Sequence, residues 1–163
     1  MTAYTTITSP LGDLLLVGDE TALTSLSLQG QRNAPAIQPG WRRDPEPFAE
    51  AIRQLGAYFD GELTEFDIPF AESGTEFQRR VWRALDEIPY GTTTTYGALA
   101  ERLGVPRDRI QALGAAIGAN PLLVLRPCHR VIGADGSMRG YAGGVERKAR
   151  LLALEGALQP ALF

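Results

Sequence analysis

Residues 75–118 decide the fold class of this chain, and they read TEFQRRVWRALDEIPYGTTTTYGALAERLGVPRDRIQALGAAIG. Apolar side chains recur along them at helical spacing, which predicts three helices. The first follows Thr75, a residue suited to cap a helix, and the other two cover residues 96–103 and 107–118. The tight turn at residues 104–106 makes the last two helices resemble a helix-turn-helix. Because packed helix pairs are common in any α-rich core, this pattern alone does not establish DNA binding.

The chain before this stretch has the pattern of strands. Short segments that are β-prone or alternate between apolar and polar residues predict a small antiparallel sheet. These segments cover residues 4–8, 14–17 and 23–28. Residues 30–47 are rich in Pro, Gly, Gln and Arg and predict a loop, and residues 46–59 have the apolar spacing of a helix.

Residues 66–74, with Pro69 and Gly74, form the expected connector between two domains. We therefore predict an α+β protein with a sheet-plus-helix domain over residues 1–74. A mostly helical domain over residues 75–163 carries the helix-turn-helix and ends in a further helix over residues 145–154.

Composition excludes several classes of protein. No apolar run approaches the ~18 residues that span a bilayer, and the first residues lack the basic and apolar regions of a secretory signal. A single cysteine, Cys128, cannot form an internal disulfide, and a single histidine, His129, cannot build a typical zinc site. We therefore expect a cytoplasmic, metal-free protein that has no membrane partner.

Charge is divided unevenly along the chain. Residues 1–74 carry four arginines against eleven acidic residues, a net charge of −7. Residues 75–163 carry twelve basic residues against eight acidic ones, a net charge of +4. This asymmetry is typical of a second half that meets a polyanion, although random scatter of charge on a small protein explains it equally well.

Cys128 is the candidate nucleophile. Most free cysteines are inert buried residues, and that interpretation stays open from composition alone. Against it, His129 follows directly and Arg126 and Arg130 flank the pair. A thiol reacts as the thiolate, which a neighbouring base or positive charge promotes. Neighbouring side chains in an extended segment point in opposite directions, so contact between Cys128 and His129 requires a turn or a bridging water.

The run Pro127-Cys128-His129-Arg130-Val131 resembles the active-site signature of the O6-alkylguanine-DNA alkyltransferases, also called methylated-DNA–protein-cysteine methyltransferases. Other landmarks of that family follow in the family's order between Thr75 and Glu155. They are Thr75-Glu76-Phe77-Gln78, Val81-Trp82, Ile88-Pro89-Tyr90-Gly91, Thr95-Tyr96, Asn120-Pro121, Gly140-Tyr141, Gly143-Gly144, Leu151-Leu152 and Leu154-Glu155. The first 74 residues resemble the family more loosely, through Ser9-Pro10-Leu11-Gly12 and Tyr58-Phe59.

The resemblance implies a DNA repair reaction with a single turnover. Such a protein flips the damaged guanine out of double-stranded DNA and moves its O6-alkyl group onto its own cysteine, here Cys128. By resemblance, His129 acts as a base through a water, and Glu155 orients that histidine. Tyr96 is similar to the tyrosine that hydrogen-bonds the guanine, and Asn120 to the asparagine that braces the turns around the cysteine. O4-alkylthymine is the expected second lesion, and no cofactor is implied, because zinc-binding members use Cys and His residues that this chain lacks.

The resemblance also implies how the lesion and the DNA are held. Backbone groups of Val131 and of the loop at Tyr141 and Ala142 are similar to the base contacts of the family, and the ring of Tyr141 would form a wall of the pocket. The family places the second helix of the helix-turn-helix in the minor groove. Small residues there allow the close approach that this requires, and they are Ala112, Gly114 and Ala115.

Two positions depart from the family pattern. An arginine that fills the space of the flipped base usually begins an Arg-Ala-Val-Gly run, and Gln111 stands there in this chain. Glutamine lacks the charge and the planar guanidinium of arginine. Arg107 and Arg109 lie within one helical turn and are the candidates to replace it. Ala142 stands where some members carry a hydroxyl, a change that leaves the backbone contact in place.

Three functions stay open at this stage. The leading hypothesis is a monomeric DNA repair alkyltransferase whose acidic N-terminal domain is a structural cap. The second is a lesion sensor that binds alkylguanine without transfer, although the known relatives of that kind lack the cysteine. The third is a transferase that acts on a small molecule, which Gln111 keeps open. A fused transcriptional regulator is disfavoured because no additional DNA-binding domain is present.

Overall fold

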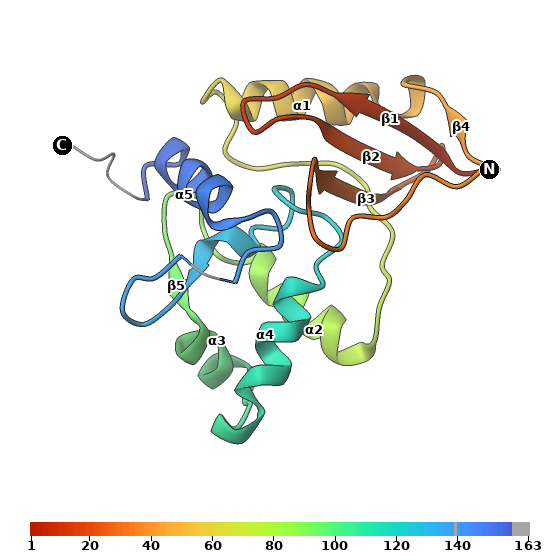
Figure 1. Cartoon of the computed structure of the whole chain (residues 1–163). Coiled ribbons are helices and arrows are strands. Elements are labelled where there is room, and N and C mark those ends of the chain that lie inside the picture. The colour runs from red at the N-terminus through yellow and green to blue at the C-terminus, as the bar shows by residue number, and fades with distance from the viewer. Residues whose placement is uncertain (139, 158–163) are drawn as a thin grey trace.

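A four-stranded sheet in the order β3-β2-β1-β4 forms the N-terminal part of the computed structural model, which describes residues 1–138 and 140–157 (Figure 1). Strands β1 (Ala3–Ile7), β2 (Leu14–Gly18) and β3 (Leu23–Leu28) pair antiparallel, as the sequence predicts. The predicted loop after β3 contains a short strand, β4 (Arg42–Arg43), which pairs parallel with β1. The sheet is therefore mixed rather than purely antiparallel. Two residues are too few to produce an alternating pattern in the sequence.

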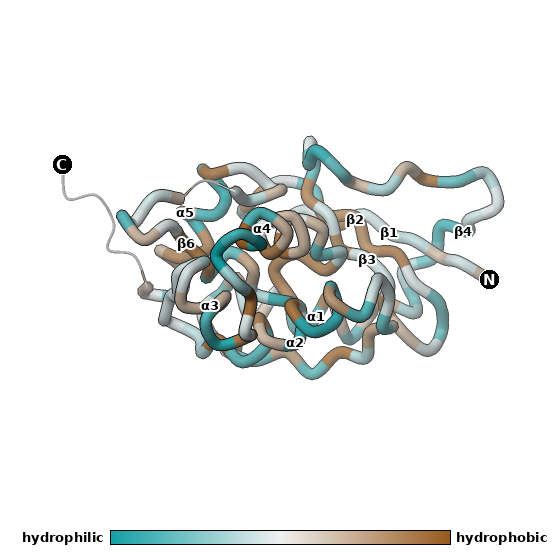
Figure 2. The backbone as a smooth tube through the Cα atoms, turned by 90° about the horizontal axis from the view of Figure 1, so that it is seen from below, coloured by the Kyte–Doolittle hydropathy of each residue, from teal (hydrophilic) through white to brown (hydrophobic). Residues whose placement is uncertain are grey.

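Helix α1 (Ala49–Phe59) follows a 3-10 turn (Glu46–Phe48) and lies along one face of the sheet (Figure 1). Its inward positions are apolar at helical spacing, and Leu55 and Tyr58 are each 1% exposed. The two elements together occupy the range of the single predicted helix. Figure 2 shows hydrophobic colours along β2, which packs in this core, and hydrophilic colours along much of the loop after β3.

The open edge of β3 is covered by two segments of the chain that lie far from it in sequence. Isolated parallel bridges join Leu23 to Phe70 in the connector and Leu26 to Leu122. The backbone N–H of Leu26 donates to the carbonyl of Pro121 at 2.9 Å, and that of Leu123 donates to the carbonyl of Leu26 at 3.2 Å. These bonds satisfy an exposed sheet edge. They also fix the segment that leads to Cys128 against the N-terminal sheet.

Three helices form the core of the C-terminal part, as predicted: α2 (Glu76–Asp86), α3 (Tyr96–Leu103) and α4 (Ile110–Gly118), the last preceded by a 3-10 turn (Arg107–Arg109). Thr75 caps α2 in a reciprocal arrangement with the side chain of Gln78. Gly104 ends α3 with a φ of 70°, a conformation that favours glycine. The indole Nε1 of Trp82 donates to the carbonyl of Ala116 at 2.8 Å, which joins α2 to α4.

A pair of two-residue strands brings the start of α3 alongside the segment after Cys128. Strand β5 (Thr94–Thr95) pairs parallel with β6 (Val131–Ile132), which follows a 3-10 turn at Cys128–Arg130. Helix α5 (Val145–Leu154) has the predicted bounds and contacts that turn. Within the described ranges, no helix has the length and apolar character needed to cross a membrane. Residues 158–163 of the predicted second domain lie outside the described part of the chain.

Candidate active site

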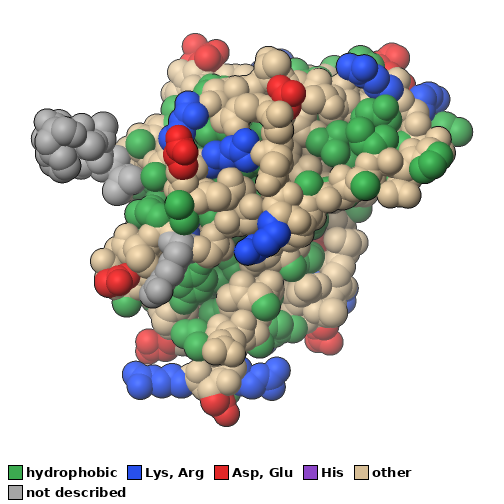
Figure 3. All heavy atoms as spheres, in the orientation of Figure 1, with side chains coloured by type: hydrophobic (Ala, Val, Ile, Leu, Met, Phe, Trp, Pro, Cys, Tyr) green, Lys and Arg blue, Asp and Glu red, His purple; other side chains and the backbone are tan. Residues whose placement is uncertain are grey.

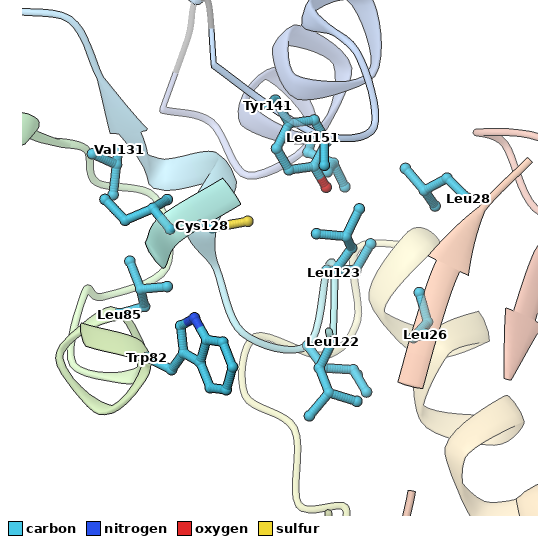
Figure 4. Packing of buried hydrophobic residues seen from close by; sticks show 14 of the residues in the cluster. Leu26, Leu28, Trp82, Leu85, Leu122, Leu123, Cys128, Val131, Tyr141 and Leu151 are labelled. Atoms are coloured by element: carbon cyan, nitrogen blue, oxygen red, sulfur yellow. The ribbon is translucent and has the colours of Figure 1, made fainter. Parts of the chain in front are cut away.

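Cys128 lies at the start of the short 3-10 turn and is buried, with 4% of its surface exposed. Pro127 precedes it with a φ of −80°, and the turn changes the direction of the chain within three residues. Figure 4 shows its sulfur directed away from Val131 and toward the space flanked by Leu123 and Tyr141. Contact between the side chains of Cys128 and His129 requires a turn or a bridging water, and the structure places both residues on a turn.

Asn120 braces the segment that leads into this turn. Its Nδ2 donates to the carbonyl of Arg126 at 3.1 Å, and its Oδ1 accepts the backbone N–H of Leu122 at 3.0 Å. The same Nδ2 lies 3.3 Å from the sulfur of Cys128. Asn120 is only 1% exposed, so these contacts satisfy an amide that burial would otherwise make costly. The structure brings Asn120 and Cys128 together, as the resemblance implies.

Glu155, the residue that follows α5, lies against His129. The two side chains are fully buried, and His129 Nε2 is 2.8 Å from Glu155 Oε2. Arg130 makes a two-point contact with the same carboxylate, through Nε to Oε1 at 2.8 Å and Nη2 to Oε2 at 3.0 Å. The hydroxyl of Tyr58 on α1 also donates to Oε2, at 2.5 Å. Burial raises the pKa of Glu155, but the hydrogen bonds from His129, Arg130 and Tyr58 outweigh it and lower the pKa to about 2.

These contacts determine the protonation state of His129. Burial lowers the pKa of its imidazole, and the charges of Arg130 and Lys148 lower it further, against the opposing effect of Glu155. The ring is therefore neutral at pH 7. Because Nε2 faces a carboxylate, Nε2 carries the proton and Nδ1 is the free acceptor. Nδ1 is buried and has no hydrogen-bond partner among the described residues.

The thiol of Cys128 is protonated in this state. Burial raises its pKa to about 11, although the amide of Asn120 and the charge of Lys148 act in the other direction. Such a thiol becomes a nucleophile only when a base accepts its proton. The unprotonated Nδ1 of His129, next to it in sequence, is suited to do so. The arrangement has the three kinds of group that nucleophilic catalysis uses: a thiol, a base and a carboxylate beside the base.

The flanking arginines do not supply the positive charge at the thiol. Arg126 is 2% exposed, pairs with Asp86 at 3.2 Å and Glu72 at 3.4 Å, and lies 4.5 Å from the ring centre of Phe70. The guanidinium of Arg130 is committed to Glu155. The cation that acts on Cys128 is Lys148, the only lysine of the chain.

Lys148 is buried on α5, where its Nζ donates to the carbonyl of Val131 at 2.5 Å. It lies 5.9 Å from the ring centre of Tyr96. Burial lowers the pKa of Lys148 to about 8, so its charge is retained at pH 7. Tyr141 and Ala142 are also buried, and Tyr141 lies 6.4 Å from His129 between ring centres.

A groove of about 540 Å³ opens between α4 and the start of α3. Its walls come from α4, the start of α3, the loop after β3 and the glycine-rich loop, and they are Arg32, Asn33, Tyr96, Gly114, Ala115, Gly118, Ala119 and Gly140. Cys128 does not line this groove. Gln111 and Arg109 are exposed and Ala112 is half-buried, but these three residues lie outside its walls. Of the residues predicted to meet DNA, the structure thus places Gly114, Ala115 and Tyr96 around one hollow.

Among residues 1–138 and 140–157, no group of three or more His, Cys, Asp or Glu side chains is placed so that it could hold a metal ion.

Two family models together span nearly the whole chain. The first is described as 6-O-methylguanine DNA methyltransferase, ribonuclease-like domain, and matches residues 2–71. The second, 6-O-methylguanine DNA methyltransferase, DNA binding domain, matches residues 76–157. This chain belongs to the 6-O-methylguanine DNA methyltransferase family.

Similar proteins share its full length. A protein from Mycolicibacterium paratuberculosis named methylated-DNA–protein-cysteine methyltransferase is 52% identical over 99% of this chain and 96% of its own. A protein of the same name from Methanosarcina acetivorans is 47% identical over 94% of this chain and 98% of its own. A crystal structure of Mycobacterium tuberculosis OGT in complex with DNA is 48% identical, with a TM-score of 0.88, over 95% of this chain and 93% of that chain. The predicted family and fold class are thereby confirmed.

Three residues around this methyltransferase-family site have partners or roles that the sequence does not predict: Tyr58, Arg130 and Lys148. Arg130 is expected beside the thiol because it stands two residues after the cysteine, but it pairs with Glu155. Tyr58 lies in a stretch that resembles the family, yet 97 residues separate it from Glu155, so no local pattern predicts their contact. No role is predicted for Lys148, whose one signal is that it is the only lysine.

Proposed function

We propose that this chain repairs O6-alkylguanine in double-stranded DNA by transferring the alkyl group to the sulfur of its own Cys128. The observation that carries the proposal is that Cys128, His129 and Glu155 are buried together in a member of this family. The thiol is held protonated, the adjacent imidazole is neutral with Nδ1 unprotonated, and Nε2 lies 2.8 Å from the carboxylate. The names of its full-length relatives support the same activity.

The proposed step balances without a cofactor. His129 Nδ1 accepts the thiol proton, through a water, and the resulting imidazolium is stabilised by Glu155. The sulfur then attacks the alkyl carbon, a bond between sulfur and carbon forms, and the bond between that carbon and O6 breaks. The electron pair returns to the guanine, which takes up one proton and so balances the one lost by the thiol. The thioether that remains on Cys128 has no route back, so each molecule reacts once.

We assign the flipped base to the region between the cysteine turn and the start of α3. Tyr96 is proposed to hydrogen-bond the guanine, and backbone groups of Val131 and Ala142 to contact its edge. Tyr141 would form a wall. The pairing of β5 with β6, which joins the residues before Tyr96 to those after the cysteine turn, supports this placement.

We assign DNA binding to α4, which presents Gln111, Ala112, Gly114 and Ala115, with Arg109 at its start. Small side chains allow the close approach of a helix to the minor groove. Basic side chains flank the lower end of the molecule, where the turn between α3 and α4 lies, with acidic side chains among them (Figure 3). Contacts of this kind bind the phosphate backbone and carry little sequence preference, as repair of scattered lesions requires.

Several finer statements belong to the same proposal. We propose that the protein is a monomer in solution. A free thiol supports a reducing compartment such as the cytoplasm. O4-alkylthymine presents the same group, an alkyl on an exocyclic oxygen, and is the proposed second substrate. We also propose that the chain divides into domains over residues 1–74 and 75–163.

The deciding experiment is the intact mass of the protein after incubation with a duplex oligonucleotide that contains one O6-methylguanine. The wild type should gain about one methylene, while Cys128→Ser and a reaction with unmodified duplex should show no gain. Gln111→Arg should react faster if the glutamine handicaps base flipping. Tight binding of the lesion without a mass gain would favour a sensor. Neither binding nor gain on DNA, with transfer from the free alkylated base, would favour a small-molecule substrate.

A further inference from the structure

The N-terminal part of the molecule reaches the catalytic carboxylate through a single side chain. Tyr58 lies in the last turns of α1, is 1% exposed, and donates its hydroxyl to Glu155 Oε2 at 2.5 Å. Among the described residues, the other side-chain donors to that carboxylate are His129 and Arg130, which lie on the turn that carries Cys128. The sheet-plus-helix domain therefore contacts the proton-accepting pair directly.

The oxygen that Tyr58 contacts is the one that holds the histidine. Oε2 of Glu155 accepts from His129 Nε2 at 2.8 Å, from Arg130 Nη2 at 3.0 Å and from Tyr58, whereas Oε1 accepts from Arg130 Nε. Donors that share one carboxylate oxygen compete for its negative charge. The tyrosine hydroxyl thus acts on the strength of the bond between Glu155 and His129.

We propose that Tyr58 is a positioning residue for alkyl transfer, so that the N-terminal domain takes part in the chemistry rather than only covering it. The inference rests on the proposed function and deepens it. By drawing charge from Oε2, the hydroxyl keeps the imidazole of His129 neutral and its Nδ1 ready to accept the thiol proton. The tyrosine keeps its own proton, because burial and the charge of Glu155 raise the pKa of its hydroxyl.

The ring of Tyr58 is held independently of its hydroxyl. Phe59 and Phe66 lie 5.3 Å and 5.1 Å from it between ring centres, and Tyr90 lies 6.3 Å away, perpendicular to it. A phenylalanine fills the same place, so Tyr58→Phe removes the hydrogen bond and little else. Tyr90→Phe is the matched control, because its hydroxyl makes only a long contact of 3.5 Å with the carbonyl of Leu154.

The charged groups that act on the pKa of His129 are Glu155, Arg130 and Lys148. Cys128, Tyr58 and Tyr141 are buried in the same cluster, and burial raises the pKa of each above its ordinary value. None of these six groups has an ordinary pKa between 5 and 8, whereas His129 does. The acid side of the profile of transfer rate against pH therefore reports the protonation of His129.

The test measures the rate of transfer from an O6-methylguanine duplex over a range of pH in wild type, Tyr58→Phe and Tyr90→Phe. Without the hydroxyl, Glu155 stabilises the imidazolium more strongly, so the acid midpoint of Tyr58→Phe should move up by about one pH unit. At a fixed pH on that side, the variant is then about tenfold slower. Incorporation of 3-fluorotyrosine at position 58, a stronger donor, should move the midpoint down. Tyr90→Phe should match the wild type.

Nitrogen-15 NMR of the only histidine supplies a second readout that needs no substrate. The resonances of His129 should shift in Tyr58→Phe and stay unchanged in Tyr90→Phe. Unchanged resonances together with an unchanged acid midpoint would overturn the proposal and leave Tyr58 a packing residue. If the wild type transferred no alkyl group, the proposed function would fail, while the NMR comparison would still decide whether Tyr58 acts on His129.

Discussion

The substitution Glu155→Gln is expected to lower the free energy of unfolding by about 3 kcal/mol at pH 7. The magnitude follows from the carboxylate itself, whose pKa falls from an ordinary 4.5 to about 2 in the folded protein. A shift of one pKa unit corresponds to about 1.4 kcal/mol, so the folded state favours the ionised form over the neutral one by about 3 kcal/mol. Glutamine replaces the ionised form with a neutral group of the same shape.

The geometry of the site supports this magnitude. Both oxygens of Glu155 accept hydrogen bonds, from Arg130, His129 and Tyr58, and an amide offers only one oxygen. Its NH2 group must therefore face a donor in any orientation. Arg130 would also lose the only carboxylate it contacts in the described part of the chain. Removing one partner of a buried ion pair typically costs about 3–5 kcal/mol.

Urea denaturation at pH 7 measures the effect. Glu146→Gln is the control, because Glu146 is an exposed carboxylate in the first turn of the same helix, and it should stay within about 0.5 kcal/mol of the wild type. Arg130→Met should cost less in the Glu155→Gln background than in the wild type, since its partner is already gone. A loss below about 1 kcal/mol in Glu155→Gln, or strict additivity of the two changes, would refute the reasoning.

Three further outcomes are expected. Lowering the pH below about 6.5 should destabilise the protein, because the unfolded chain protonates its histidine more readily than the folded protein does. A second loss of stability should follow between pH 4.5 and about 2, where Glu155 gains a proton first in the unfolded chain. Denaturation midpoints that stay constant from pH 7 to pH 3 would contradict this. Complete methylation of Cys128 should lower the melting temperature, because an added methyl enters a packed site, and equal melting temperatures before and after reaction would exclude that effect. Gly140→Ala should slow transfer more than Gly136→Ala does: both glycines have a positive φ, but only at Gly140 would a Cβ meet another side chain, at 2.5 Å from the hydroxyl of Tyr96. Equal rates in the two variants would show that Tyr96 tolerates displacement.

The fold could be predicted where local pattern alone determines structure. The helix predicted over residues 145–154 has those bounds, and Thr75 caps α2 as expected. The strands β4 and β5 could not be predicted, since two residues have no period and their partners are supplied by distant parts of the chain. Thr94–Thr95 pairs with residues more than thirty positions later. Pairing of this kind depends on the tertiary fold and not on local propensity.

The site could be predicted in part for the same reason. The sequence around Cys128 indicates a nucleophile with a base beside it. The family resemblance adds Glu155, which lies against His129, and Asn120, which lies against Cys128. The roles of Arg126 and Arg130 could not be judged from their position next to the cysteine. Each points to an acidic partner brought from elsewhere in the chain. Charges near in sequence act on a thiol only if the fold leaves them unpaired beside it.

From the sequence, Cys128 could be either an inert buried residue or a nucleophile, and its burial explains why both interpretations were open. With a pKa of about 11, only about one molecule in ten thousand carries the thiolate at pH 7, which slows reaction with dissolved electrophiles. A protein that reacts once gains from this, because any stray alkylation would consume it. In the proposed mechanism the proton passes to His129 while an alkyl carbon is held at the sulfur, and a flipped base meets that second condition. The same burial that makes the residue look structural therefore makes its reaction selective.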